Sequence, residues 1–235
     1  MLELFKNQYV QSVLDFIYPN LCLGCGDYLE SEKQICSHCE KKIEVIKLPY
    51  CLHCMHYMEN KTTCSSCKSN SYPLFSYATY ESPMREIIIE YKFRDITSIA
   101  SDIAQRISDQ FEPLVRELKA DMLIPIPLHK SRESSRGYNQ ALILANELNK
   151  RMNIPVHEDI LHRVKKRKPQ AKLSTPERQK NIESVFQVES LAPCELTCIL
   201  VDDVVTTGST VFEATKELNE HGYKVVAVIS IAHAF

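Results

Sequence analysis

The sequence predicts an α/β fold in which a parallel sheet is preceded by a small cysteine-rich module. Three observations carry this prediction. Strand-like and helix-like segments alternate after residue 72, the late strand candidates are nearly continuous apolar runs, and eight of the ten cysteines lie between positions 22 and 67. A length of 235 residues, with 44% hydrophobic and 25% charged side chains, suffices for one substantial domain and one small one.

Residues 1–20 are predicted to form an amphipathic helix, because apolar side chains recur close to a helical period and Pro19 ends the run. Its polar face mixes acidic and basic groups, so packing on the protein is favoured over a membrane surface. No run approaches the roughly 18 apolar residues of a membrane span, and no basic leader precedes an apolar run. We therefore expect a cytoplasmic protein without stable membrane insertion.

Residues 21–70 carry four C-x-x-C pairs, which predict a double zinc ribbon. Two such turns supply the four sulfurs of a closed structural Zn²⁺ site, so we pair the first two turns around one ion and the last two around another. Cross-paired ligation or a single occupied site stays open, as do unliganded thiols and a redox role. A disulfide framework is disfavoured, because the pairs precede a long cysteine-poor region and no export signal is present. The candidate ligands are Cys22, Cys25, Cys36, Cys39, Cys51, Cys54, Cys64 and Cys67.

Glycine is scarce, with 5 residues in the chain, so each position is informative. Gly24 and Gly26 lie in Cys-Leu-Gly-Cys-Gly, where the backbone must curl around the thiolates, and we expect positive φ there. The second ribbon lacks these glycines. Because so few large apolar side chains are present, the metal ions would act as the core of this module.

Residues 72–235 are predicted to form the second domain. Its expected elements, in order, are a strand at 75–80, helices at 82–93 and 96–118, a strand at 121–126, a helix at 139–152, a strand at 196–201, a helix around 211–218 capped by Gly222, and a strand at 225–232.

The segment after the strand at 196–201 carries the chemistry. Two adjacent carboxylates precede a hydroxyl-rich turn, and a helix follows in which Thr210-x-x-Glu213 resembles a capping box. Free amides, hydroxyls and the positive helix end suit a phosphate, whereas the carboxylates suit the vicinal hydroxyls of a sugar. The candidate residues are Asp202, Asp203, Thr206, Thr207, Gly208, Ser209 and Thr210.

A second motif follows the strand at 121–126, where Pro-Ile-Pro-Leu ends the strand and Arg-Gly-Tyr-Asn-Gln-Ala begins a helix. Cations gather at this exit, so it suits a diphosphate. A third segment, 162–180, carries eight Lys/Arg and one Glu, a local charge of +7 against −9 for the rest of the chain. It would close over a diphosphate, bind single-stranded nucleic acid, or remain a solvated loop.

The acidic pair and its turn resemble the phosphoribosyl-diphosphate (PRPP) loop of type I phosphoribosyltransferases. Together with the four cysteine pairs and the Arg-Gly-Tyr-Asn-Gln motif, they make the chain similar to the ComF family of competence proteins, although family members often carry Phe where this chain has Tyr138. The resemblance implies a type I phosphoribosyltransferase fold after a zinc module.

The resemblance also implies roles for single residues. Asp202 and Asp203 would engage the ribose 2′ and 3′ hydroxyls, directly or through Mg²⁺, and the hydroxyl-rich turn would hold the 5′-phosphate. Residues expected at the diphosphate or in the mobile loop are Pro127, Leu128, Arg136, Gly137, Asn139, Gln140, Arg163, Gln170, Lys172, Arg178 and Asn181.

Three functions follow as hypotheses. The first is a competence protein that binds PRPP with Mg²⁺ and handles single-stranded DNA in natural transformation, with a DNA-uptake helicase or recombination proteins as partners. The second is a metabolic phosphoribosyltransferase for purine salvage or amination. The third is a non-catalytic zinc-ribbon nucleic-acid binder. The sequence shows no acceptor site, so it leaves turnover open.

Overall fold

A computed structural model describes residues 19–30, 33–58, 64–67, 72–93, 97–129, 131, 134, 136–164, 185–189 and 195–234. The amphipathic helix predicted at residues 1–20 falls almost wholly outside these ranges. No helix of the described parts combines the length and the apolarity that a bilayer crossing needs.

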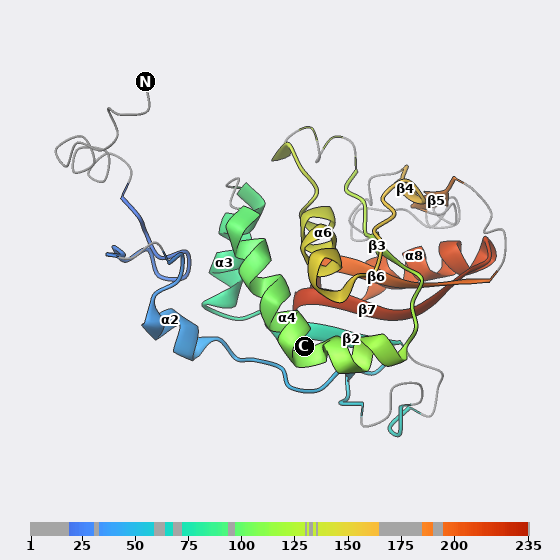
Figure 1. The fold of residues 1–235 in the computed structure, drawn as a ribbon, viewed down its shortest axis with the longest axis horizontal. Coiled ribbons are helices and arrows are strands. Elements are labelled where there is room, and N and C mark those ends of the chain that lie inside the picture. The colour runs from blue at the N-terminus through green and yellow to red at the C-terminus, as the bar shows by residue number, and fades with distance from the viewer. Residues whose placement is uncertain are drawn as a thin grey trace, which may run out of the picture.

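A five-stranded sheet with the order β1-β2-β7-β6-β3 forms the centre of the molecule (Figure 1). Four neighbouring strands run parallel, and β1 pairs with the edge of β2 in the antiparallel sense. This confirms the predicted α/β class and adds an antiparallel edge strand to it. The strands are β1 (Tyr50–Cys51), β2 (Pro73–Thr79), β3 (Met122–Pro125), β6 (Leu196–Val205) and β7 (Tyr223–His233).

Helices cover one face of the sheet, and a mixed layer covers the other. On the first face, α3 (Met84–Phe93), α4 (Thr97–Glu117) and α6 (Gln140–Met152) share an apolar cluster with the sheet. On the second face, α8 (Ser209–Glu220) packs together with a two-stranded hairpin, β4 (Leu161–Arg163) and β5 (Phe186–Val188). Burial on both faces explains why β6 and β7 read as nearly continuous apolar runs.

Side-chain alternation in β6 divides these two clusters. Ile199 and Val201 belong to the helical face, whereas Cys198 and Leu200 belong to the second face. All four are fully buried. The sheet is therefore the middle of three layers, and its C-terminal strand ends are where such folds bind ligands.

The structure differs from the sequence prediction at the end of β6. The strand continues to Val205, so the two carboxylates lie within it and do not follow it. Helix α8 begins at Ser209 with Gly208 as its N-cap, so the capping box predicted from Thr210 and Glu213 was wrong. Gly222 lies one residue past the end cap, with φ of +87°, as expected for a glycine that stops a helix.

The zinc module contributes one short helix and one edge strand. Helix α2 (Ser37–Lys42) has Cys36 as its N-cap, and the Cys36 sulfur accepts the N–H of Cys39. In Figure 1, α2 lies beside α3 and α4, away from the middle of the sheet. The later cysteines lie near β1, which belongs to the sheet itself.

Candidate functional site

Two groups of four cysteines occur within the described residues, and each is compact enough for a single metal ion. The sulfur atoms of a group all lie within 4.8 Å of one another. The first group combines the first two C-x-x-C turns, and the second combines the last two, which is the pairing that we expected. The groups are Cys22, Cys25, Cys36 and Cys39, and Cys51, Cys54, Cys64 and Cys67.

The spacing of the sulfurs fits zinc. A tetrahedral ion with Zn–S bonds of about 2.3 Å separates its sulfurs by about 3.8 Å. The Sγ atoms of Cys25 and Cys36 are 3.8 Å apart, and those of Cys54 and Cys64 are 3.5 Å apart. A disulfide requires about 2.05 Å. The residues present therefore fit two closed structural zinc sites, in which zinc would fix the turns without offering an open position for chemistry.

Backbone amides favour the thiolate form that a metal requires. The N–H of Cys36 donates to Cys22 Sγ at 3.2 Å. Burial alone would raise the pKa of the Cys22 thiol, but this bond and the N–H groups of Cys25 and Gly24 lower that pKa to about 6. Cys22 is thus prepared to receive a cation, whereas the pKa of the Cys25 thiol in the same turn is raised to about 11, with its Sγ donating to Asp27 Oδ2 at 3.2 Å.

The two ribbons place different residues at the position with positive φ that follows the turn. Gly26 has φ of +77°, and Met55, at the equivalent place after the second turn, has φ of +56° without being glycine. The expectation of positive φ was wrong for Gly24, which is needed for space instead. A Cβ there would lie 2.9 Å from Cys39 Sγ and 3.0 Å from Pro83 Cβ.

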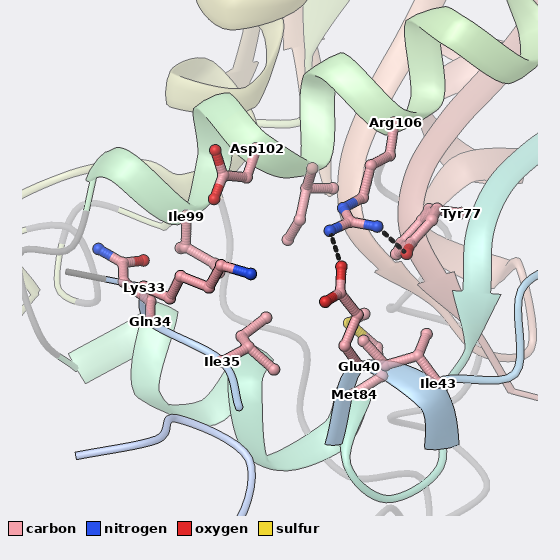
Figure 2. Close-up of a pocket in the computed structure, with 11 residues that line it drawn as sticks. Lys33, Gln34, Ile35, Glu40, Ile43, Tyr77, Met84, Ile99, Asp102 and Arg106 are labelled. Atoms are coloured by element: carbon pink, nitrogen blue, oxygen red, sulfur yellow. Dashed lines mark hydrogen bonds and ion pairs between the residues drawn. The ribbon is translucent and has the colours of Figure 1, made fainter. Parts of the chain in front are cut away.

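The first ribbon joins the second domain through Leu23 and Ile43, which are buried in the cluster on the face of α3, α4 and α6, and through polar contacts around a cavity of about 150 Å³. Figure 2 shows Arg106 reaching from α4 toward Glu40 of α2 and Tyr77 of β2. The Lys33 side chain points into the same space, and Asp102 lies at its rim. The ion pair between Arg106 and Glu40 is more than a third exposed on both sides. This joint is therefore partly open and solvated.

The second ribbon is part of the sheet and its core. Strand β1 places Tyr50 opposite Leu74 and Cys51 opposite Pro73. Leu52, between two ligands, is 1% exposed and belongs to the cluster on the α8 face. This joint is continuous with the fold.

The acidic pair, Asp202 and Asp203, lies where β6 runs on past the end of its neighbour. Strand β3 ends at Pro125, opposite Val201, and the N–H of Ile126 donates to the carbonyl of Val201 at 2.8 Å. From Asp202 onward, this side of β6 has no strand partner in β3. The carboxylates thus lie at the C-terminal strand ends, in the position where open α/β sheets bind ligands.

Lys92, at the end of α3, was missed by sequence reasoning and belongs to this site. Its Nζ is 2.9 Å from Asp203 Oδ2, and both side chains are less than a fifth exposed. Burial, and next the charge of Asp203, raises the pKa of Asp202 well above its usual range. A bound cation would relieve the mutual repulsion of the two carboxylates.

The hydroxyl turn, residues 206–210, follows directly. Thr206 and Thr207 are exposed, and Thr207 Oγ1 donates to Ser209 Oγ at 3.0 Å. Gly208 is buried, with φ of +70°, and caps α8 without a side chain. The turn therefore presents hydroxyls beside the amino end of a helix, a combination that favours a phosphate.

The Arg-Gly-Tyr-Asn-Gln motif holds the end of α3 in place. Tyr138 donates its hydroxyl to the carbonyl of Tyr91 at 2.7 Å, and Gln140 Nε2 donates to the carbonyl of Lys92 at 3.4 Å. In return, the buried Tyr91 hydroxyl donates to the carbonyl of Gln140 at 2.8 Å. The motif therefore fixes the last turn of α3, from which Lys92 reaches the acidic pair.

The remaining side chains of this motif bond to the protein itself. Asn139 caps α6 and donates through Nδ2 to the carbonyl of Ile126 at 3.1 Å. Arg136 Nη1 donates to Gln140 Oε1 at 3.3 Å, whereas Gly137 is exposed. The diphosphate role of these residues stays a prediction.

Pro127, Leu128 and Arg163 line one cavity of about 140 Å³ beside the end of β3. The Arg163 guanidinium lies 5.4 Å from the ring centre of Phe186, so a cation–π contact holds it. Four other predicted loop residues lie outside the described ranges: Gln170, Lys172, Arg178 and Asn181.

Comparison with protein families agrees with this division. A model described as "Double zinc ribbon domain" matches residues 13–68, and one described as "Phosphoribosyl transferase domain" matches residues 136–234. The first model and the two cysteine groups together support zinc as the bound metal.

Characterised proteins match over most of the chain. "Competence protein F" of Haemophilus influenzae is 31% identical over 91% of this chain and 96% of its own length. "Competence protein ComFC" of Bacillus subtilis is 30% identical over 83% of this chain and 81% of its own length. The orotate phosphoribosyltransferase of Aeropyrum pernix, a solved structure, aligns at 18% identity over 75% of this chain and 74% of its own, with a TM-score of 0.34.

Proposed function

Because the chain belongs to the ComF family of competence proteins, we propose that it binds PRPP with Mg²⁺ and handles single-stranded DNA in natural transformation. The first part of this proposal is carried by one observation. The acidic pair lies beside a hydroxyl turn at the strand ends, and this turn opens a helix. Phosphate and ribose hydroxyls are the ligand groups that such neighbours complement.

The donor set fits Mg²⁺, because this ion prefers carboxylate and substrate oxygens and keeps several waters. Asp202 and Asp203 would hold it, and its charge would bind the ribose hydroxyls and the diphosphate together. The protein's own part is to orient the acids. Asp202 Oδ1 accepts the N–H of Asp203 at 2.8 Å, and Asp203 Oδ1 accepts the N–H of Val204 at 2.7 Å.

The reaction class that this site supports is displacement at C1′ of the ribose. The bond from C1′ to diphosphate breaks as a nucleophile attacks, and the diphosphate leaves with the bonding electrons. Lys92, at the end of α3, and Arg136, in the segment before α6, would supply positive charge for the leaving group. Turnover depends on an acceptor, and the proposal of PRPP binding does not require one.

The DNA part rests on charge and on relatives. Relatives are named competence proteins, and one in Salmonella typhimurium, 28% identical over 89% of this chain, is named "DNA utilization protein YhgH". Residues 162–180 concentrate a charge of +7 in a chain of net charge −2. Such a segment can neutralise the phosphates of a single strand of nucleic acid. The proposed setting is the cytoplasm, with a DNA-uptake helicase or recombination proteins as partners.

Isothermal titration calorimetry with PRPP and Mg²⁺ tests the ligand. Wild-type protein should bind, and Asp202→Asn combined with Asp203→Asn should weaken binding by about 100-fold or more, since charged hydrogen-bonding groups contribute roughly 1.5–3 kcal/mol each. Asp121→Asn, at the opposite end of β3, is the matched control and should bind as wild type does. An equal affinity in all three proteins would exclude this site.

Titration of a labelled single-stranded oligonucleotide at 50 and 200 mM salt tests the second part. Affinity should fall steeply with salt. Replacing Lys165, Lys166, Arg167 and Lys168 by Gln should weaken binding and flatten the salt dependence. Neutralising the exposed Lys41 and Lys42 of α2 is the control and should change neither. Steady release of diphosphate with a base or amine would instead indicate a metabolic phosphoribosyltransferase.

A further inference from the structure

The second zinc ribbon touches the hydroxyl turn directly. A Cβ on Gly208 would lie 3.4 Å from Leu52 Cδ1 and 3.1 Å from Phe212 Cε2. Leu52 stands between the ligands Cys51 and Cys54, and its own N–H donates to the carbonyl of Tyr72 at 3.1 Å. Leu52, which lies between two cysteine ligands, thus packs against the hydroxyl turn.

The contact extends to the neighbour of Leu52. The ring of His53 stands edge-on to that of Phe212, with centroids 6.3 Å apart and planes at 87°. Phe212 lies in the first turn of α8, and its N–H donates to the carbonyl of Gly208 at 2.8 Å. The ribbon therefore meets both the turn and the helix that the turn begins.

The first ribbon has an equivalent leucine in a different place. Leu23 follows Cys22 just as Leu52 follows Cys51, and both are buried. Leu23 belongs to the cluster on the face of α3, α4 and α6, whereas Leu52 belongs to the cluster on the face of α8. The two C-L-x-C turns are alike in sequence, yet they support opposite faces of the sheet.

We propose that Leu52 is a positioning residue for the hydroxyl turn and that it links the second zinc site energetically to the ribose phosphate site. This inference rests on the proposed binding of PRPP. The physical basis is the backbone of Gly208, whose positive φ, which glycine adopts without strain, aims the first amides of α8, and against which Leu52 and Phe212 pack. Cys51 and Cys54 would hold the zinc ion and thereby fix Leu52 between them, and Leu52 packs with Phe212 against Gly208.

Coupling of this kind is reciprocal. If the ordered second ribbon favours phosphate binding, then bound phosphate must favour retention of the second zinc ion by the same factor. Mutations along such packed routes change coupling by about 0.5–2 kcal/mol, which corresponds to roughly 2- to 30-fold in an affinity.

Paired variants of full-length, zinc-loaded protein test the inference. Leu52→Ala should weaken calorimetric binding of PRPP–Mg²⁺ by about 3- to 30-fold, and Leu52→Met should stay within about twofold of wild type because it conserves volume. Leu23→Ala, with an equivalent truncation, should also stay within about twofold. If Leu52→Ala does not fold, Phe212→Leu trims the same contact from the other side and should weaken binding in the same direction. Equal binding by the Leu52, Phe212 and Leu23 variants would overturn the inference.

Zinc release supplies a readout that lost stability alone would not produce. Transfer of zinc to a chromogenic chelator should show one ion whose release slows several-fold when PRPP–Mg²⁺ is added and one ion whose release does not. Phe212→Leu should abolish the slowing and leave two ions bound per chain. Two ions slowed equally, or neither slowed, in a protein that binds PRPP would contradict the link.

A failure of the proposed function can be distinguished from a failure of the positioning role of Leu52. Wild-type protein that binds no PRPP overturns the function, and the positioning role is then tested by amide hydrogen exchange in 206–210. Exchange there should accelerate in Phe212→Leu and not in Leu23→Ala. Equal exchange in both would overturn the positioning role.

Discussion

The two zinc ribbons have the same ligands and different attachments. The first buries Leu23 on the face of α3, α4 and α6 and meets α4 through an exposed ion pair between Glu40 and Arg106, beside a cavity of about 150 Å³. The second contributes an edge strand to the sheet and a fully buried leucine, Leu52, to its core. The spacing of the cysteine ligands therefore does not indicate which part of the fold a structural zinc site stabilises. The residues between the ligands determine this, because they make the contacts with the rest of the protein.

Loss of one metal site is the largest expected effect. Cys51→Ser with Cys54→Ser should abolish PRPP binding and lower the melting temperature strongly, since structural zinc contributes on the order of 10 kcal/mol and this ribbon is continuous with the sheet. Cys22→Ser with Cys25→Ser should lose one ion and keep PRPP binding. Zinc content, thermal unfolding and calorimetry measure this, and loss of binding in both variants would remove the distinction between the ribbons.

Gly26 in the first ribbon and Gly208 beside the second ribbon have similar φ, but only Gly208 is crowded by neighbouring side chains. Gly208→Ala places a Cβ in a crowded, left-handed turn, so it should cost about 2 kcal/mol of unfolding free energy or more and weaken PRPP binding. Gly26→Ala, where φ is +77° and nothing lies within 4 Å, should cost about 1 kcal/mol and leave binding unchanged. Urea unfolding and calorimetry measure both, and equal costs would show that crowding at Gly208 is unimportant.

Asp202 should lower the stability of the protein while it contributes to PRPP binding, whereas the zinc ligands of both ribbons should raise the stability. Burial raises the pKa of Asp202 in the folded protein, so between about pH 4 and that raised pKa the folded state holds a proton that the unfolded chain has lost. The free energy of unfolding therefore falls as the pH rises through this range. Asp202→Asn should therefore be more stable than wild type at pH 7.5, by on the order of 1 kcal/mol, while PRPP binding weakens by about 10-fold or more. A destabilised variant in urea unfolding would argue for a structural role.

The smallest effect is expected at the joint of the first ribbon. Arg106→Gln breaks the exposed pair with Glu40 and should cost about 0–1 kcal/mol, less at high salt. PRPP affinity should not change. Unfolding at two salt concentrations measures the cost, and a large loss of PRPP binding would show that the first ribbon also communicates with the site.

Long periodic segments made most of the fold predictable. The strands and helices after residue 72 lie within a few residues of their expected bounds, because burial on one or both faces imposes the apolar pattern. The two-residue β1 and the three-residue β4 and β5 were not predicted. Segments this short have no measurable period, and their pairing is decided by distant partners.

The candidate site was predictable where adjacent residues carry the chemistry and not where distant ones do. The cysteine spacing indicated the two groups, and Asp202, Asp203 and the hydroxyl turn are contiguous. Lys92 is a single lysine at a helix end, so only the fold reveals its ion pair with Asp203. The packing of Leu52 against the hydroxyl turn is likewise a tertiary contact.

A crystal structure of this chain with PRPP and Mg²⁺ would show whether the acidic pair and the hydroxyl turn hold the ligand. We expect electron density for the 5′-phosphate against the amides and hydroxyls of residues 206–210, with the ribose hydroxyls or the Mg²⁺ at Asp202 and Asp203. A fully occupied ligand elsewhere on the protein, with Lys92 still paired to Asp203 and the hydroxyl turn free of phosphate, would contradict it.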